Sequence, residues 1–465
     1  MEVLDDVIAA ARLVPLSEAV EVNPKIDRTA LHDDLDVSFV PMAAVEALSG
    51  GIDVSTVRKY AGVKKGYTHF RDGDILFAKV TPCMENGKMA IARKLVNGVG
   101  FGSTEFHVLR PRAGVDARYI YYFVSSQTFR KEASGHMTGA VGLRRVPSTF
   151  LEEQLIPLPG IERQREIVAE LEKQFSRLDE AVANLQRVKA NLKRYKASIL
   201  KDAVEGRLVP LEAELARREG RTFETGEQLL QRILEARRKE WKGRGKCKEP
   251  VAANTAGLTP MPSGWTWATI EQLTYLVTSG SRGWGDFYSD NGVLFIRAQD
   301  IKTDALNMTG LARVDVPVDA EGSRSSVNAN DILVTITGAN VTKSALVPML
   351  SEPAFVSQHV ALLKLTSSDT AAFVFNWLVS PANGRETLEK LAYGAGKPGL
   401  SLEQVRALPV ALPPQAEQDR ICEEIERRLS LVRGVESEVD ANLKRAQALR
   451  QATLAKAFSE RDQLC

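Results

Sequence analysis

The chain has 465 residues, of which 44% are hydrophobic and 26% are charged, and its formal net charge is +2. Such a composition is that of a folded globular protein, and the length predicts two or three domains because it exceeds one ordinary core. The near-neutral net charge gives no global sign of a nucleic-acid partner. No run approaches the roughly 18 apolar residues of a membrane helix. The acidic first residues, MEVLDDVIAA, are unlike a signal peptide.

Segments in the first half read mainly as short strands. DILFAK (74–79) is one of several apolar runs bounded by Gly, Asn or Asp, a pattern typical of strands. YIYYFVSS (119–126) favours a short aromatic helix, and the glycine loop GAVGL (139–143) follows it. We therefore expect a mostly-β globular part, called here the first head (1–155).

A long amphipathic helix is predicted after the first head, from about 161 to 205. One apolar seam recurs every seven residues, and a companion seam lies beside it. The first comprises Leu171, Leu178, Leu185, Leu192 and Ile199, and the second Ile167, Ala181, Val188 and Tyr195. About five heptads predict a coiled coil, and a single helix of this kind needs a partner for its seam.

Residues 206–262 connect the two halves and contain one predicted helix, at 226–241, followed by a polar linker. A second head is expected at 263–408, starting at about Trp265. A second long helix follows. Its seam comprises Ile425, Val432, Val439 and Ala446, with Ile421, Val435 and Leu449 beside it.

The two halves repeat each other at an offset of 254 residues. LPGIERQREIVAEL (158–171) matches LPPQAEQDRICEEI (412–425), and, with a small slip, DILFAKVTP (74–82) matches DILVTITGA (331–339). A repeat this long indicates a duplicated domain. The expected fold class is α+β: two pseudo-symmetric, mostly-β heads separated by two long antiparallel coiled-coil helices.

Charge is distributed unevenly between the heads. Residues 1–53 sum to −8, 54–149 to +10, 231–248 to +6 and 263–408 to −3. A positive surface on the first half would suit a polyanion, but an ordinary solvated surface explains the same counts. Four scattered cysteines fit a reducing cytoplasm.

Signatures of catalysis are weak throughout. The chain has no phosphate-binding G-x-x-x-x-G-K-[ST] loop and no HExxH pair, and its five histidines show no metal-ligand spacing. Asp286, Asp300 and Lys302 loosely imitate the order found in Mg²⁺-dependent nucleases, but the first half has no equivalent. We expect no catalytic residue and no metal ligand.

Polar and basic loop residues are the candidates for DNA contacts, because Arg and Lys suit phosphates and guanine while Asn and Gln suit adenine. In the first head they are Lys64, Lys65, Arg71, Lys79, Thr81, Asn86, Lys88, Arg144 and Arg145. In the second head they are Ser281, Arg282, Trp284, Arg297, Gln299, Lys302, Thr337, Asn340, Lys343, Gln358 and Lys397. Taken singly, each is better explained as ordinary surface than as a DNA contact.

Several segments together resemble the specificity subunit of type I restriction–modification enzymes. They include IPLPGIERQREIVAELE (156–172), NLKRYKASILKDAVEGRLVP (191–210), MPSGWTWATIEQL (261–273), KPGLSLEQV (397–405) and ALPPQAEQDRI (411–421). The resemblance touches nearly the whole chain in the family's order. Two departures are GIERQ in the first copy, where the family favours an LPPLxEQ-like run, and a first head without the Gly-Trp opening seen at Gly264-Trp265.

The resemblance implies that each head is a target-recognition domain reading one half of a split double-stranded DNA site, while the helices set the spacing. It implies these divisions: 1–155 first recognition domain, 156–208 first helical region, 209–262 linker segment, 263–408 second recognition domain, 409–465 second helical region. The family's helices dock two methyltransferase subunits, which carry S-adenosylmethionine, and two motor/nuclease subunits using ATP and Mg²⁺ join them. This cytoplasmic host-defence subunit would itself bind no cofactor and no membrane.

Two other functions stay open on the residues alone. One is a self-sufficient DNA methyltransferase, or a nuclease that uses Asp286, Asp300 and Lys302. The other is a coiled-coil scaffold without DNA, which would show no salt-sensitive DNA affinity.

Overall fold

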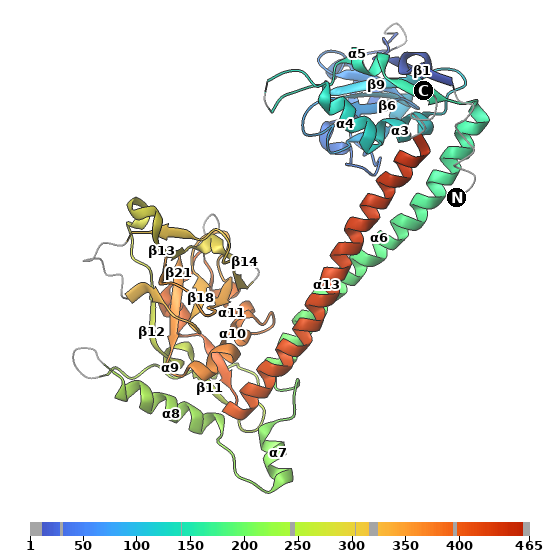
Figure 1. Ribbon diagram of the computed structural model, residues 1–465. Coiled ribbons are helices and arrows are strands. Elements are labelled where there is room, and N and C mark those ends of the chain that lie inside the picture. The colour runs from blue at the N-terminus through green and yellow to red at the C-terminus, as the bar shows by residue number, and fades with distance from the viewer. Residues whose placement is uncertain are drawn as a thin grey trace. The chain divides into compact units, whose positions relative to one another are not determined.

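The computed structural model describes residues 12–27, 31–140, 142–241, 247–302, 304–315, 324–393 and 398–458. It divides into two compact units, unit 1 (1–187 and 439–465) and unit 2 (188–438). Each unit contains one head and the adjoining parts of two long helices (Figure 1).

The first head is built on two four-stranded sheets. Its strands are β1 (Arg12–Pro15), β2 (Val20–Val22), β3 (Asp36–Val40), β4 (Val57–Lys59), β5 (Thr68–Arg71), β6 (Ile75–Ala78), β7 (Met89–Ile91), β8 (Val99–Gly102), β9 (Phe106–Pro111) and β10 (Leu155–Leu158). Its helices are α2 (Leu16–Ala19), α3 (Ala117–Ser125), α4 (Gln127–Gly135) and α5 (Ser148–Glu153). The strand orders are β2-β9-β6-β7 and β4-β3-β8-β5, and only β3 and β8 pair in parallel.

The second head has the same arrangement. Its strands are β11 (Thr266–Thr269), β12 (Thr274–Ser279), β13 (Tyr288–Ile296), β14 (Ile301–Lys302), β15 (Ala305–Leu306), β16 (Ala312–Val314), β17 (Ser326–Val327), β18 (Ile332–Thr335), β19 (Ser344–Leu346), β20 (Ala354–Val356), β21 (Val360–Leu365) and β22 (Pro409–Leu412). Its helices are α9 (Ile270–Leu273), α10 (Ala371–Val379), α11 (Gly384–Leu391) and α12 (Leu402–Arg406). The sheets run β12-β21-β18-β19 and β16-β13-β20-β17, with β13 and β20 in parallel.

Strand registers confirm the duplication residue by residue. Ile75 lies opposite Leu109 in the first head, and Ile332 lies opposite Leu363 in the second. β10 pairs with β1 and β22 pairs with β11, so each globular part extends to the Leu-Pro pair, a few residues past the predicted bounds. The predicted helix at 226–241 is α8 (Gly226–Lys239), and α7 (Glu212–Glu219) precedes it.

Two long helices, α6 (Ile161–Val204) and α13 (Gln415–Phe458), confirm the predicted coiled-coil segments, and they run antiparallel (Figure 1). In unit 1, Arg450 on α13 donates to Asp179 on α6 over 2.7 Å. In unit 2, Lys196 donates to Glu436 over 2.5 Å. Ile425 and Val439 are buried, as heptad seam positions should be.

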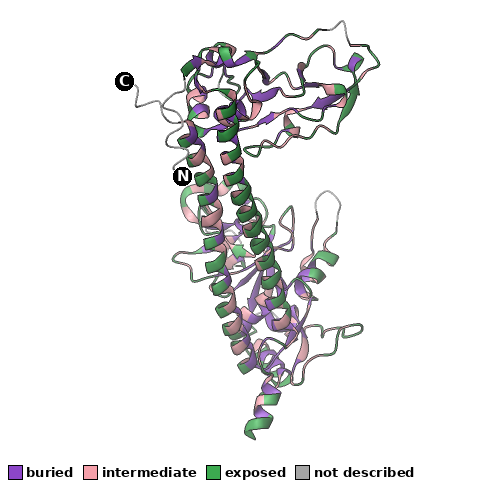
Figure 2. Cartoon of the chain, turned by 90° about the vertical axis from the view of Figure 1, so that its right-hand side faces the viewer, coloured by how far each residue is buried: buried purple, intermediate pink, exposed green. Residues whose placement is uncertain are grey.

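Most of the companion seam is not buried. Val188, Tyr195, Val435 and Leu449 are 39%, 46%, 46% and 57% exposed. The prediction that these four residues pack into the contact between the two helices is therefore wrong. One apolar stripe on each helix is enough to cover that contact. Figure 2 shows the strands of each head largely buried, whereas much of both long helices is exposed.

The core of each head extends into its helix ends. In unit 1, Val168 and Leu171 on α6 and Leu454 on α13 belong to the same buried cluster as the sheet residues Ile75 and Leu109. At about 25 cal/mol for each Å² of apolar surface removed from water, such burial is the main force holding the helices to the head.

Candidate nucleic-acid interface

Two loops of the first head are joined edge to edge, and we call them the first-head loop pair (79–88 and 142–146). The Thr81 N–H donates to the Arg144 carbonyl over 3.0 Å, and the Arg144 N–H donates to Thr81 Oγ1 over 3.2 Å. The Val146 N–H donates to the Lys79 carbonyl over 2.9 Å. The structure thus brings Lys79 and Thr81 together with Arg144 and Arg145, which lie more than 60 residues further along the chain.

Acidic residues hold the two arginines of this loop pair. The Arg145 guanidinium donates to both carboxylate oxygens of Glu105, over 2.9 and 2.7 Å. This hydrogen bonding is the main reason that the pKa of Glu105 lies below its usual value. Arg144 lies 3.9 Å from Glu85. Arg145 is therefore held in one geometry and its charge is partly balanced, which suits hydrogen bonding to a base edge more than attraction to phosphate.

Other predicted residues of the first head lie outside this contact. Lys64 pairs with Asp33 over 2.9 Å, Lys65 is exposed nearby, and Arg71 ends strand β5. Within loop 79–88, Asn86 is exposed and the Lys88 ammonium donates to the Met42 carbonyl over 3.1 Å.

Sequence reasoning missed Arg58. Its guanidinium lies 3.6 Å from the centroid of the Phe39 ring, and Tyr67 packs edge-on against that ring at 5.0 Å. β4 is exposed along its whole length and β3 is buried after its first residue, so no alternating pattern pointed to Arg58, and only the pairing of these strands places it over Phe39.

In the second head, a cavity of about 330 Å³, called here the second-head pocket, gathers five of the predicted residues. They are Ser281, Trp284, Arg297, Gln299 and Gln358, and Tyr288, Phe295, Ser357 and His359 also line the pocket. The residues come from the loop after β12, from β13 and the turn that follows it, and from the β20–β21 turn. Pockets of this size, with apolar walls and a few polar groups, are typical of ligand sites.

Trp284 is part of the packed wall of this pocket. It is only 5% exposed, stacks on Phe295 with ring centroids 5.5 Å apart, and meets Phe355 edge-on. An indole buried in this way contributes apolar surface to the pocket wall and cannot extend outward to contact DNA directly.

Arg297 and Asp300 form an ion pair, and this contact weakens the alternative in which Asp300 is part of a nuclease site. The Arg297 guanidinium donates to both Asp300 carboxylate oxygens over 3.0 Å, and the Arg297 N–H donates to Asp300 over 2.8 Å. The Asp300 carboxylate is thus engaged inside its own turn, while Asp286 and Lys302 are exposed. Within the described residues, no three His, Cys, Asp or Glu side chains converge to hold a metal ion.

The remaining predicted residues lie around the adjoining loops. The Asn340 amide donates to the Ala298 carbonyl over 3.0 Å, so the 336–343 loop is tied to the pocket turn. Thr337 pairs with Gly399, Lys343 is half-buried in the same loop and Arg282 is exposed. Lys397 lies outside the described residues.

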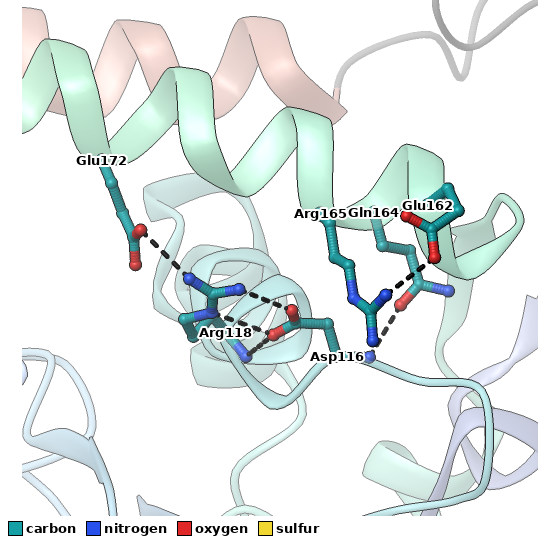
Figure 3. Close-up of polar contacts among 6 residues, drawn as sticks. All are labelled: Asp116, Arg118, Glu162, Gln164, Arg165 and Glu172. Atoms are coloured by element: carbon teal, nitrogen blue, oxygen red, sulfur yellow. Dashed lines mark hydrogen bonds and ion pairs between the residues drawn. The ribbon is translucent and has the colours of Figure 1, made fainter.

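Figure 3 shows how α6 is fastened to the first head. The Gln164 amide donates to the Pro159 carbonyl over 2.8 Å, and its oxygen accepts from the Asp116 N–H over 2.9 Å. Arg118 then joins Asp116, over 2.8 Å, to Glu172 on α6, over 3.2 Å. The glutamine of the first repeated LP…Q motif is thus a structural anchor.

The second copy of this glutamine makes the same contact in unit 2. The Gln418 amide donates to the Pro413 carbonyl over 2.9 Å. Beside it, Glu417 is buried and accepts from the Trp265 indole over 2.9 Å and from the Glu212 N–H over 2.8 Å. The Gly-Trp opening is therefore fastened to the start of α13 by this carboxylate.

Comparison with known proteins finds relatives that share the sequence features of this chain. Residues 13–193 match the family model of the type I restriction modification DNA specificity domain. The chain is 27% identical over 457 residues to the type I restriction enzyme EcoAI specificity subunit of Escherichia coli, an alignment covering 87% of this chain and 75% of that protein. It is 28% identical over 472 residues to the EcoEI specificity subunit of Escherichia coli, covering 89% and 76%.

A solved structure of a type I R-M system contains a chain with the same fold. The TM-score is 0.66 at 19% identity, over 97% of this chain and 98% of that chain, and at this identity the likeness concerns the fold alone. The fold therefore defines the class: a duplicated two-headed protein with paired long helices. The family model over residues 13–193 and the two relatives show that the chain is similar to type I restriction–modification specificity subunits, the family that its motifs resemble.

A membrane span is not found in the part of the chain that the structure describes. None of its helices combines enough length with enough apolar character to cross a bilayer.

Proposed function

We propose that each head reads one half of a two-part double-stranded DNA site and that α6 and α13 set the gap between the halves. The observation that carries this proposal is a duplicated fold whose two copies present different polar residues on the corresponding loops. A mismatched base pair costs only about 1–3 kcal/mol, so one small head selects a common sequence. Two linked heads multiply their selectivity because the second binds at high effective concentration.

Within the first head, the loop pair is the proposed reading surface. Lys79 and Arg144 would contact phosphates and Arg145, held by Glu105, would contact a base edge. In the second head, the residues around the pocket, above all Gln299 and Gln358, would read bases. Exposed cations such as Lys65, Arg282 and Lys302 would add phosphate contacts.

Exposed apolar residues on the long helices support a second part of the proposal, the docking of two methyltransferase subunits. Leu431 and Val435 are 63% and 46% exposed and lie one turn apart on α13, and Leu449 is 57% exposed. Apolar side chains grouped on an exposed helix face are typical of protein interfaces. Two motor/nuclease subunits would join this assembly in the cytoplasm.

The chain itself would carry no catalysis. S-adenosylmethionine would be held by the methyltransferase subunits, and ATP and Mg²⁺ by the motor/nuclease subunits. The engagement of Asp300 by Arg297 supports this part, because it removes one carboxylate from the loose nuclease pattern.

Mapping methylated bases across the genome tests the proposal directly. The host expresses this chain, its neighbouring methyltransferase, both or neither, and long-read sequencing identifies the modified bases. We expect a split motif with a fixed gap only when both are present. Methylation by this chain alone would make it an enzyme, and the same motif without this chain would show that it does not select the site.

A further inference from the structure

The second-head pocket contains polar groups that the protein itself leaves unsatisfied. The hydroxyl oxygens of Ser281 and Ser357 are buried, and neither has a hydrogen-bond partner among the described residues. Ser357 as a whole is 6% exposed. Both residues line the same cavity of about 330 Å³. A buried hydroxyl without a partner is unfavourable, so a pocket with two of them is suited to a ligand that hydrogen-bonds to both.

The walls of the pocket favour a flat, aromatic ligand. Trp284 stacks on Phe295 with an angle of 29° between their ring planes, and Tyr288, 50% exposed, meets Phe295 edge-on at 5.8 Å. These three side chains all line the cavity. Trp284 and Phe295, 5% and 4% exposed, form the packed wall, so the exposed Tyr288 ring is the surface on which an unpaired nucleobase can stack, and every base permits this because each has a π-face.

The electrostatics of the pocket favour a neutral group over a phosphate. Its cation, Arg297, is balanced by the bidentate contact with Asp300. The remaining polar side chains at its edge include Gln299, Gln358 and His359, which present amide and imidazole groups. Amides of Asn and Gln pair well with base edges.

The first head differs at the corresponding place. Phe39 faces Phe101 across the parallel strands β3 and β8, as Phe295 faces Phe355 across β13 and β20. However, the Arg58 guanidinium covers the Phe39 ring at 3.6 Å. Phe39 and Phe295 are both buried, so the difference between the heads is the group that covers the ring: a guanidinium in the first head and the Trp284 indole, which also lines the pocket, in the second.

We infer that the second-head pocket holds a purine or pyrimidine base that has left the base stack of the bound duplex. The inference rests on the proposed DNA-reading function and deepens it. Removing a base from the stack is unfavourable, and least so for a base whose pairing is already disturbed. Stacking in the pocket and two hydrogen bonds to Ser281 and Ser357 would offset this cost and restrict which base is accepted.

The test uses the complete complex of this chain with its methyltransferase subunits and a duplex carrying the mapped site. The double variant Ser281→Ala/Ser357→Ala is expected to bind this duplex about tenfold more weakly, since each lost hydrogen bond weakens binding by about two- to tenfold. The melting temperature of the free variant should be unchanged or higher, because neither hydroxyl has a partner to lose. Ser380→Ala is the matched control: its hydroxyl is also buried and unpaired among the described residues, but Ser380 does not line the pocket.

Duplexes with an abasic site at each position of the second half-site identify the base. At one position only, the wild type and the double variant should bind alike, because the base that would fill the pocket is missing. The inference is overturned if the variant binds the intact duplex as tightly as the wild type, or if its deficit persists at every abasic position. A third result would also overturn it: nucleoside monophosphates raise the melting temperature of the wild type but not of the double variant, while both bind the duplex with equal affinity. The ligand of the pocket would then be a free nucleotide. A wild-type complex without site-specific binding would instead refute the proposed function, and the inference with it.

Discussion

The Asp331 carboxylate and the Lys364 ammonium form a buried ion pair in the second head, with 2.6 Å between Oδ2 and Nζ and side chains 9% and 5% exposed. The first head has the pair Asp74–Arg110 in the same place, at 2.7 Å. Each aspartate precedes a central strand, β6 or β18, and each cation lies on the neighbouring strand, β9 or β21. Each aspartate also accepts a backbone N–H from the residue three positions earlier. Duplication has thus kept the ion pair while exchanging arginine and lysine.

Breaking the pair should destabilise the second head strongly. Lys364→Met leaves the Asp331 carboxylate buried and unpaired, which should lower the free energy of unfolding by about 3–5 kcal/mol, whereas Lys364→Arg should cost much less. All five tryptophans lie in unit 2, so urea unfolding followed by tryptophan fluorescence reports on this unit. Arg110→Met in the first head is the control, and it should leave the tryptophan transition unchanged. Equal stability of Lys364→Met and the wild type would show that the pair contributes little.

The two anchor glutamines should differ in their effect. Gln164 uses both ends of its amide, while the Gln418 oxygen has no partner among the described residues. Gln164→Leu removes the partner of the Asp116 N–H and of the Pro159 and Gly114 carbonyls, at about 1–3 kcal/mol for each group left unpaired, whereas Gln418→Leu removes the partner of the Pro413 carbonyl. Hydrogen exchange at the first turns of α6 and α13 measures this. We expect the larger loss of protection at α6, and equal losses would contradict the difference in bonding.

Glu417 should make the stability of unit 2 depend on pH. Burial raises the pKa of this carboxyl above its usual value, against the hydrogen bonds from Glu212 and Trp265. The pKa of Glu417 is higher in the folded state than in the unfolded state. The contribution of this carboxyl to stability is therefore fully present below the unfolded-state pKa of about 4.3, and it is lost as the pH rises through the folded-state pKa. The wild type should therefore lose stability relative to Glu417→Gln as the pH is raised through this window, as measured by tryptophan-monitored unfolding. Glu423→Gln, an exposed carboxylate on the same helix, should show no such relative change.

Salt dependence should separate phosphate contacts from base contacts in the first-head loop pair. Lys79→Ala should weaken binding of the assembled complex to any duplex and lower the slope of log K against log salt by about one. Arg145→Ala should relax the preference at one position of the first half-site and leave the second half-site unchanged. Lys173→Ala on α6 removes the same charge outside the head and should alter neither property. If Lys79→Ala leaves the slope as it was, this lysine does not contact phosphate.

Docking of the methyltransferase subunits should depend on the exposed apolar residues of α13. Leu431→Asp places a charge in the proposed interface, which should reduce co-purification of the methyltransferase with this chain at least tenfold, since desolvating a carboxylate is costly. Ser430→Asp adds the same charge at the adjacent exposed position and should have a much smaller effect. Equal retention of the methyltransferase by both variants would remove Leu431 from the interface.

Local patterns in the sequence determined much of the architecture. The seven-residue spacing of Leu171, Leu192 and Ile199 predicts α6 because a helix face is defined within a few turns of the chain itself. The repeated LP…Q motifs and the offset of 254 residues revealed the duplication before any contact was known. These features need no information about which distant segments meet.

Only the tertiary structure decided which loops meet and which side chains turn inward. Backbone hydrogen bonds between the loop after β6 and the loop after α4 join Thr81 to Arg144, and three separate segments bring Ser281, Arg297 and Ser357 around one pocket. Trp284 resembles an exposed loop residue in the sequence, yet stacking on Phe295 buries it. The physical reason is that strand pairing and side-chain packing depend on residues far apart in the chain, whereas helical periodicity and turn preferences are properties of neighbours.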